Sequence, residues 1–237
     1  MEIQGLPVTA HGLAVHGPRG PVFEDVDLEV PSGGLLVVHG PGGSGRTSLL
    51  LALAGRMRIT AGTVQVGQYR LPGRRRDTAA VRTAVAVARA EPAVALEGRL
   101  TVAEHIAERT WLHPGTTRTL VAEALAVTAI APDPAALTED LHPADRVLLA
   151  VALTLAQKPA VLVVDDATHG CPPADHHRIW HALQQVCGTG CTVLAADTAP
   201  PPLGPHHTLS LPRHTAHLLR ARSLPAAASP AVGSEAA

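Results

Sequence analysis

A glycine-rich run between an apolar segment and a helix-forming one carries the clearest chemical signal in the sequence. The run is Gly40-Pro41-Gly42-Gly43-Ser44-Gly45-Arg46-Thr47, with a short apolar stretch before it and the helical composition of 47–53 after it. Glycines let backbone N–H groups curl around phosphate oxygens, and the start of a helix adds a favourable dipole. The run therefore predicts a phosphate-binding loop, in which the hydroxyl of Thr47 is placed to bind Mg²⁺.

Two other interpretations of this run stay open. It fits the phosphate-loop motif G-x-x-x-x-G-K-S/T except that Arg46 replaces lysine, and it also fits the dinucleotide motif G-x-G-x-x-G from Gly40 onward. The dinucleotide motif expects an acidic residue about 20 positions later to hold the ribose, and residues 30–76 contain no Asp or Glu. A turn without any ligand is the other interpretation. Arg46 can neutralise phosphate charge, although its wide planar fork does not replace a slim ammonium inside a tight loop.

Two adjacent carboxylates close an apolar segment of strand length later in the chain. Val161–Val164 is followed directly by Asp165 and Asp166. A carboxylate at the end of a buried strand can hold Mg²⁺, directly or through water, opposite the threonine of a phosphate-binding loop. Apolar strands often end in Asp, so the pair gains its meaning from the loop upstream. Together the two motifs predict Thr47 and Asp165 as the Mg²⁺ ligands.

Strand and helix patterns alternate around these motifs. Strands, the first of them half-exposed, are expected at 23–30, 35–38, 63–66, 161–164 and 192–196. Helical patterns occupy 47–53, most of 101–141, 143–157 and 174–187. The arginine run at 74–76 follows a Pro-Gly pair and is expected in a solvated loop. The alternation favours an α/β fold, in which helices cover the faces of a parallel sheet.

Composition and charge narrow the class of protein. The 237 residues are 46% apolar and 2% aromatic, and they carry a formal net charge of −1. This balance gives no long-range pull on DNA or RNA and few rings for stacking bases, so no nucleic-acid partner is expected. Three cysteines are too few for a disulfide scaffold, and reduced cytosolic thiols are expected. The longest apolar stretch, 147–156, is too short to span a bilayer, and the N-terminus lacks the pattern of a signal peptide.

With its motifs in this order, the chain resembles the ATP-binding cassettes of ABC transporters from about Gly12 to Leu219. Three stretches carry the resemblance: FEDVDLEVPSGGLLVVHGPGGSGRTSLLLALAGRMRITAGTVQVG, AEPAVALEGRLTVAEHI and RVLLAVALTLAQKPAVLVVDDAT. The resemblance implies an α/β P-loop NTPase core with a mixed or parallel sheet, an N-terminal antiparallel β portion and an inserted helical subdomain. The cassette is expected over 1–221, with the helical subdomain at about 91–158 inside it. A tail over 222–237, rich in Ala and Ser, is expected to be disordered.

The resemblance also implies ligands and partners. ATP and Mg²⁺ are the expected cofactors, and His16 stands nearest to the place where the family stacks an aromatic ring on adenine. The expected partners are a membrane permease subunit and a second cassette, in a head-to-tail homodimer or heterodimer. The chain is then cytoplasmic and peripheral on the inner face of the cell membrane. The residues implied in nucleotide binding are Gly40, Pro41, Gly42, Gly43, Ser44, Gly45, Arg46, Thr47, Ser48 and, as a weak stacking partner, His16.

Several positions that define the family carry unusual residues in this chain. The glutamine that links the sheet to the helical subdomain aligns with Ala90, and the switch histidine aligns with Thr198. The catalytic glutamate becomes Asp166, whose carboxylate is one methylene shorter and is a weak catalytic candidate. The signature loop, usually Leu-Ser-Gly-Gly-Gln, aligns with Leu141-His142-Pro143-Ala144-Asp145. Its proline has no N–H to give and its aspartate repels phosphate, so this segment is expected to start a helix instead.

These substitutions lead to one favoured function and two alternatives. The favoured function is the ATP-binding subunit of an ABC-type transporter that binds ATP–Mg²⁺, couples to a permease, and hydrolyses ATP weakly or not at all. The alternatives are a fully active transport ATPase and a soluble P-loop enzyme unrelated to transport. A zinc site at His177 and His181, with Asp175 or His176 as a third ligand, is a further interpretation, against which a solvated helix face is expected.

Overall fold

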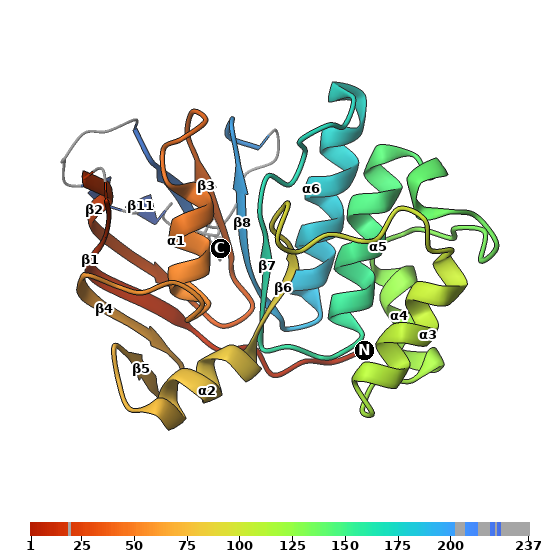
Figure 1. Cartoon of the computed structure of the whole chain (residues 1–237), viewed down its shortest axis with the longest axis horizontal. Coiled ribbons are helices and arrows are strands. Elements are labelled where there is room, and N and C mark those ends of the chain that lie inside the picture. Colours follow the sequence, from red (N-terminus) through yellow and green to blue (C-terminus); the bar gives the residue numbers. More distant parts are fainter. Residues whose placement is uncertain (19, 202–206, 213–218, 221, 224–237) are drawn as a thin grey trace, which may run out of the picture.

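Two β-sheets with a helix packed between them lie on one side of the structure, and a group of helices lies on the other side (Figure 1). The computed structural model describes residues 1–18, 20–201, 207–212, 219–220 and 222–223. One sheet is mostly parallel and the other mostly antiparallel. This is the mixed α/β architecture that the sequence predicts.

The larger sheet has the strand order β11-β9-β3-β8-β7-β6. Neighbouring strands pair in parallel, except that β11 is antiparallel to β9. The carboxyl ends of β3, β7 and β8 therefore share one edge, where ligands of open parallel sheets bind. The strands are β3 (Leu35–His39), β6 (Val85–Arg89), β7 (Val161–Val164), β8 (Thr192–Asp197), β9 (His207–Ser210) and β11 (Arg222–Ser223). Of the tail expected to be disordered, only the two residues of β11 are described, and 224–237 lie outside the described residues.

The smaller sheet has the order β10-β2-β1-β4-β5 and is antiparallel except where β10 joins β2. Its strands are β1 (Val8–Gly17), β2 (Gly20–Val30), β4 (Ala61–Val66), β5 (Tyr69–Leu71) and β10 (Leu219–Arg220). This sheet is the N-terminal antiparallel portion that the resemblance implies. Within it, β2 and β4 contain the strands expected at 23–30 and 63–66.

Helices pack on both sides of the larger sheet. They are α1 (Arg46–Leu53), α2 (Arg75–Ala84), α3 (Val102–Leu112), α4 (Arg118–Val127), α5 (Pro143–Leu155), α6 (Pro173–Gly188) and the 3₁₀ helix η1 (Thr138–Asp140). Helices α3 and α4 lie in the region expected to be mostly helical, and α5 begins at Pro143 as predicted. Among the described residues, none of the helices combines the length and the apolar character needed to cross a bilayer.

The central strands are buried on both faces, which explains their unbroken apolar runs. Val38 and Leu194 belong to a core that also contains residues of α1 and of the antiparallel sheet. Their neighbours Val37 and Val193 belong to a second core with residues of α5 and α6. Successive side chains of these strands thus pack into the two cores in turn and hold the sheet between two layers. The same packing positions the sheet edge at which the glycine loop and Asp165 follow their strands.

The arginine run at 74–76 does not form the expected loop. Arg75 and Arg76 form the first turn of α2, and the backbone N–H of Arg74 donates to Oδ2 of Asp77 at 3.2 Å. This contact is half of a capping box, and it starts a helix despite three cations at the end of the dipole that disfavours them. The three side chains are nevertheless exposed, as a solvated run should be.

Candidate functional site

The glycine loop joins β3 to α1 and is shaped by close backbone contacts. Gly43 and Gly45 have φ angles of 78° and 92°, in a region that other residues rarely adopt. A Cβ on Gly45 would lie 2.8 Å from the carbonyl oxygen of Val22, and one on Gly40 would lie 2.1 Å from that of Leu211. The loop is therefore held between β2 and the residue that follows β9, with no room for side chains at these two positions.

Arg46, the first residue of α1, turns its guanidinium back into the loop. Nη1 donates to the carbonyl oxygen of Gly40, and Nη2 lies 2.5 Å from Oδ1 of Asp166. The Arg46 side chain is 8% exposed, whereas that of Asp166 is 38% exposed. Nε of Arg46 is buried and has no hydrogen-bond partner in the described part of the chain. Arg46 therefore links the start of the loop to the acidic end of β7.

Thr47 and Asp165, the two predicted Mg²⁺ ligands, lie in direct contact. Oγ1 of Thr47 donates to Oδ2 of Asp165 at 2.5 Å. Oδ1 of Asp165 and Oγ of Ser44 are both buried without a partner among the described residues. Burial raises the pKa of Asp165, and the hydrogen bond from Thr47 opposes that rise. A hydroxyl and a carboxylate with one oxygen to spare form the oxygen-rich donor set that Mg²⁺ prefers, so these residues fit the ion.

Asp166, the weak catalytic candidate, has a left-handed backbone with a φ of 44°. Few residues other than glycine adopt this conformation, although Asp tolerates it better than most. Two contacts hold it in place: the ion pair with Arg46, and a hydrogen bond of 3.0 Å from Nη1 of Arg89 to its carbonyl oxygen. The carboxylate of this weak catalytic candidate is therefore engaged by a cation.

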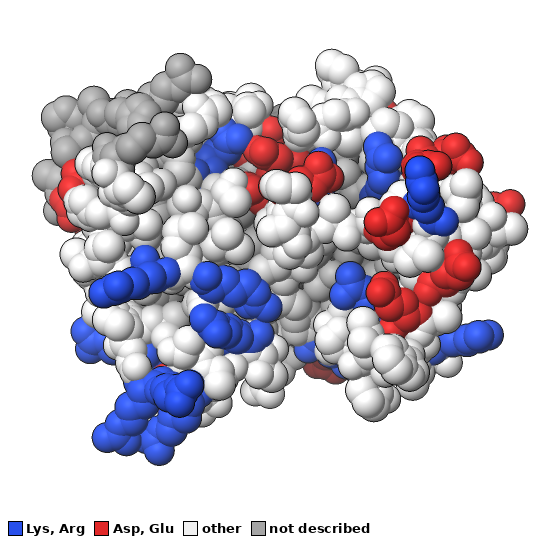
Figure 2. Space-filling view, in the orientation of Figure 1, with Lys and Arg blue, Asp and Glu red and all other residues white. Residues whose placement is uncertain are grey.

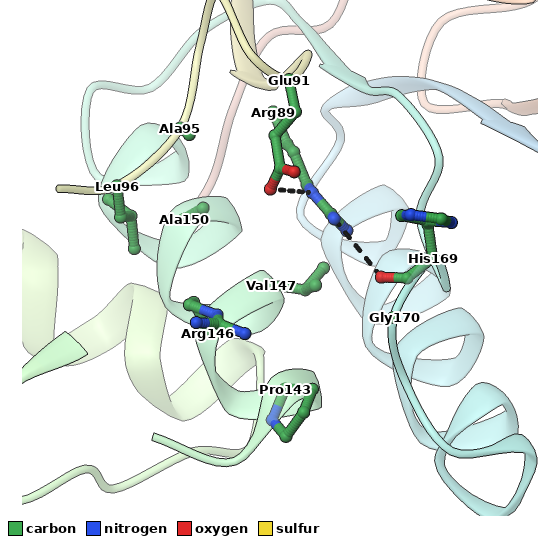
Figure 3. Close-up of a pocket in the computed structure, with 10 residues that line it drawn as sticks. All are labelled: Arg89, Glu91, Ala95, Leu96, Pro143, Arg146, Val147, Ala150, His169 and Gly170. Carbon is green, nitrogen blue, oxygen red and sulfur yellow. Dashed lines mark hydrogen bonds and ion pairs between the residues drawn. The ribbon is translucent and has the colours of Figure 1, made fainter. Parts of the chain in front are cut away.

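Arg89, at the end of β6, is a residue of the site that the sequence does not predict. Its guanidinium contacts Oε1 of Glu91 at 3.2 Å and the carbonyl oxygen of His169 at 3.3 Å (Figure 3), as well as that of Asp166. The one signal in the sequence is a charged residue that closes the apolar segment 85–88, because a charge in a buried strand needs partners. Arg89 fastens the segment that leads into the helical subdomain to the loop after β7.

A pocket of about 270 Å³ opens beside Arg89 (Figure 3). Pro143 and Arg146 at the start of α5 line it from one side, and His169 lines it from the other. None of the residues that line it belongs to the glycine loop. The pocket therefore marks the joint between the sheet and the helical subdomain, not the predicted phosphate site.

The positions aligned with the glutamine and the switch histidine carry no ionisable group. Ala90 is buried and exchanges two backbone hydrogen bonds of 2.9 Å with Val94. Oγ1 of Thr198 lies 3.3 Å from Oδ1 of its neighbour Asp197. Asp197 is itself buried and accepts hydrogen bonds from N and Oγ1 of Thr168, at 3.0 and 2.6 Å. Asp197, and not Thr198, ties the end of β8 to the loop after β7.

The segment aligned with the signature loop is the start of α5, as the sequence predicts. His142 precedes the helix and Pro143 is its first residue. Nη2 of Arg178 on α6 donates to Oδ1 of Asp145 at 2.5 Å. Nε2 of His142 lies 3.6 Å from Oδ2 of Asp175, which is also on α6. The polar side chains of this segment are thus directed to their own chain.

His16 lies on β1, near the hairpin turn into β2, and both of its ring nitrogens have partners. Nδ1 lies 2.9 Å from Oγ1 of Thr60, and Nε2 lies 2.8 Å from Oε1 of Glu24. The ring is held in one orientation, with its side chain 44% exposed. Ser48 lies one residue after Thr47, in the first turn of α1. Ser48 is thus on the helix that follows the glycine loop directly, whereas His16 is on β1, which pairs with the strand that contacts the loop.

The histidine pair on α6 does not form a metal site. The rings of His177 and His181 stack with their centroids 6.4 Å apart. Within the described residues, no group of three or more His, Cys, Asp or Glu side chains is arranged to hold a metal ion. The two histidines are exposed, which agrees with the solvated helix face expected from the sequence.

Comparison with known proteins decides the family. The family model described as "ABC transporter" matches residues 23–169, a span that contains the glycine loop, α5 and both acids that follow β7. The chain belongs to the ABC transporter family.

Relatives in the ABC transporter family align with most of the chain. A Streptomyces avermitilis protein, whose name assigns it to ABC transporter ATP-binding proteins, is 32% identical over 194 residues, which cover 81% of this chain and 34% of the relative. The energy-coupling factor transporter ATP-binding protein EcfA2 of Symbiobacterium thermophilum is 31% identical over 184 residues, covering 73% and 61%. The chain spans about a third of the length of this Streptomyces avermitilis relative and of a Streptomyces coelicolor relative that is 30% identical over 191 residues.

Solved structures of the family share the fold. The structure of cbiO1 from Clostridium perfringens, part of the ABC transporter complex cbiONQ, has a TM-score of 0.70 at 18% identity, covering 91% of this chain and 86% of that one. A nucleotide-free ATP-binding cassette from an ABC transporter has a TM-score of 0.71 at 16% identity, covering 90% and 88%. The two sheets and the helical subdomain are thus those of ABC cassettes.

Proposed function

We propose that this chain is the ATP-binding subunit of an ABC transporter and that it binds ATP–Mg²⁺ between the glycine loop and Asp165. The contact of Thr47 with Asp165, beside a loop of positive-φ glycines that leads into a helix, carries the proposal. Backbone N–H groups in such a loop bind phosphate. Oγ of Ser44 and Oδ1 of Asp165 support it further, because both are buried beside the loop without a partner in the described structure, and a phosphate and a metal ion would satisfy them.

Different residues of the site bind the phosphates and the metal ion. The N–H groups of the loop and the guanidinium of Arg46 neutralise the phosphates, while Thr47 and Asp165 hold Mg²⁺ through oxygen atoms. The ion, when bound, neutralises charge on the outer phosphates. Arg46 reaches the phosphates by exchanging the carboxylate of Asp166 for a phosphate oxygen. Its guanidinium is therefore paired with an anion in both states.

Hydrolysis at this site is proposed to be weak or lost. A general base must come within about 2.6–3.2 Å of the attacking water. Asp166 is the only carboxylate aligned with that task, and its Oδ1 is engaged by Nη2 of Arg46 at 2.5 Å instead of being free for a water. Ala90 and Thr198 offer no acid or base in its place. The loss of a positioned base typically lowers the rate by about 10²–10⁴-fold.

The partners are proposed to be a membrane permease subunit and a second cassette. The start of α5 supports pairing with a different, more competent cassette. Pro143 offers no N–H at that point, and Asp145 is engaged by Arg178 of its own chain and has no proton to donate to a phosphate. We place the chain on the cytoplasmic face of the membrane, because the family is one of transporters.

A thermal melt with and without ATP–Mg²⁺ tests the proposal. At a ligand concentration of about 100 times Kd, binding stabilises the folded state by about 2.7 kcal/mol. For a chain of this size that is a rise in Tm of roughly 5–10 °C. Arg46→Ala should lose most of the rise, whereas Arg118→Ala, an exposed position at the start of α4, should keep it. A wild-type Tm that does not respond to ATP–Mg²⁺ would overturn the proposal.

A further inference from the structure

One surface of the molecule is strongly basic, although the chain as a whole is nearly neutral. Residues 56–82 contain seven arginines and a single acid, whereas the whole chain carries a net charge of −1. Figure 2 shows basic side chains gathered in the lower left of the view, around the position of α2, with few acidic ones among them. All seven arginines are exposed. We call the surface that these seven arginines form the arginine face.

Three of these arginines stand where the fold itself disfavours them. Arg74, Arg75 and Arg76 surround the N-terminus of α2, the positive end of the helix dipole, where cations are destabilising. The single acid nearby is Asp77, whose Oδ1 lies 3.7 Å from Nε of the exposed Arg76. An exposed contact of that length contributes little. A cation cluster that weakens its own helix is better explained by an anion outside the chain than by folding.

Arg56 and Arg82 form a second group, in which backbone carbonyls hold the guanidiniums. Nε of Arg82 donates to Gly55 at 2.7 Å, and Nη1 of Arg56 donates to Ala54 and Val85 at 3.2 and 3.1 Å. Neither arginine has an ion pair with a carboxylate of the described residues. Burial, and then repulsion from Arg82, lower the pKa of Arg56. A bound anion would relieve this repulsion between like charges.

A shallow hollow of about 590 Å³ lies within the arginine face. Arg75, Thr78 and Arg82 line it together with two small residues. Guanidinium groups bind phosphate through paired N–H donors, and a threonine hydroxyl adds another donor. The donor set and the open shape of the hollow suit a phosphate group presented on a surface.

We propose that the arginine face binds the anionic phospholipid headgroups of a bilayer. The inference rests on the proposed role of the chain as a transporter subunit, which places it beside a membrane. DNA and RNA fit less well, because aromatic residues make up only 2% of the chain. The glycine loop precedes the first residue of α1 and Arg56 follows its last turn, so the two sites lie at opposite ends of this helix. Lipid and nucleotide can therefore be bound together.

Co-sedimentation with vesicles tests the proposal on the full chain. Vesicles of phosphatidylcholine that contain phosphatidylglycerol should bind the chain, and added salt should release it. Each arginine at an anionic surface strengthens partitioning by about fivefold. The triple variant Arg74→Gln/Arg75→Gln/Arg76→Gln should therefore bind on the order of 100-fold more weakly. It should fold at least as well as the wild type, because it removes cations from the positive end of α2.

A matched control changes the same net charge elsewhere. Arg99→Gln/Arg118→Gln/Arg146→Gln removes three exposed arginines outside the arginine face and should bind vesicles almost as the wild type does. Equal losses in the two triple variants, or equal binding to pure phosphatidylcholine, would overturn the proposal. Stronger binding to a DNA duplex or to polyglutamate in competition would also overturn it. Both triple variants should keep the thermal response to ATP–Mg²⁺, so the lipid and nucleotide proposals can fail separately.

Discussion

Arg46 and Asp166 form an ion pair of 2.5 Å between residues 120 positions apart in the sequence. The pair joins the glycine loop to the acidic end of β7, where Asp166 is the weak catalytic candidate predicted from the sequence. Under the proposed function, Arg46 binds phosphate and Asp166 acts near the attacking water, so the ion pair holds both groups away from those tasks. A phosphate that enters the loop competes with Asp166 for Arg46, and we expect this competition to govern both the affinity for ATP and its hydrolysis.

Asp166→Asn should raise the affinity for ATP–Mg²⁺ and lower the stability of the ligand-free chain. Without the carboxylate, the nearly buried guanidinium of Arg46 has no anionic partner until a phosphate binds. We expect about tenfold tighter binding and a free energy of unfolding lower by about 1–3 kcal/mol. Calorimetric titration and urea denaturation measure the two effects. Asp140→Asn, at an exposed position, serves as the control, and an affinity no higher than wild type would contradict the competition.

Gly45→Ala should damage the loop, and Gly42→Ala should not. A Cβ on Gly45 would lie 2.8 Å from the carbonyl oxygen of Val22, and the alanine would have to keep a backbone φ of 92°. A Cβ on Gly42 would meet no atom within 4 Å. We expect Gly45→Ala to lower the free energy of unfolding by about 2–4 kcal/mol. For Gly42→Ala a change below about 1 kcal/mol is expected. If urea midpoints fall equally in both variants, β2 does not constrain the loop as described.

Asp165 should lower the free energy of unfolding as pH rises, whereas a carboxylate whose pKa falls on folding raises it. Burial raises its pKa above the ordinary value of 3.8, so the folded state holds the proton at pH values where the unfolded chain has lost it. The contribution of Asp165 to the free energy of unfolding therefore falls as pH rises from about 3.8 to the raised pKa, and it stays low at higher pH. Asp165→Asn should be more stable than wild type at neutral pH, and the difference should shrink on acidification. Urea midpoints across that range measure it, and a constant difference would contradict a buried, ionised Asp165.

Arg89→Met should loosen the joint between β6 and the loop after β7. The substitution keeps an apolar stem but removes the bonds to the carbonyl oxygens of Asp166 and His169. We expect a loss of about 2–4 kcal/mol in the free energy of unfolding. Amide exchange should accelerate in 90–96 and 166–170 more than elsewhere. Arg99→Met, at an exposed position, is the matched control. A uniform change in exchange would indicate that Arg89 acts only on overall stability.

The sequence predicts the elements whose burial leaves a simple pattern. The apolar runs at 35–38, 161–164 and 192–196 became β3, β7 and β8, because central parallel strands are covered on both faces. α2 buries only Val81, so it has no apolar stripe to recognise, and its arginines suggested a loop. The cassette bounds of 1–221 and the subdomain bounds near 91–158 stay predictions.

The sequence predicts the part of the candidate site whose residues are positioned by the ends of the strands alone. Thr47 and Asp165 meet because the loop and the acid follow parallel strands that share a sheet edge. The ion pair of Arg46 with Asp166 depends on a left-handed backbone at Asp166 and on the direction of a long side chain. No local pattern encodes either feature. Arg89 was missed for the same reason, since its partners lie 77 and 80 positions away.

The fate of bound nucleotide tests most directly whether this chain binds ATP and hydrolyses it weakly or not at all. The purified chain is mixed with a limiting amount of radiolabelled ATP and excess Mg²⁺, and the protein-bound nucleotide is separated and identified over time. We expect that nucleotide is retained and remains ATP, with turnover about 10²–10⁴-fold below the rates of about 1–10³ s⁻¹ typical of enzymes. Conversion of bound ATP to ADP at ordinary enzyme rates, or no retained nucleotide at all, would contradict the proposed function.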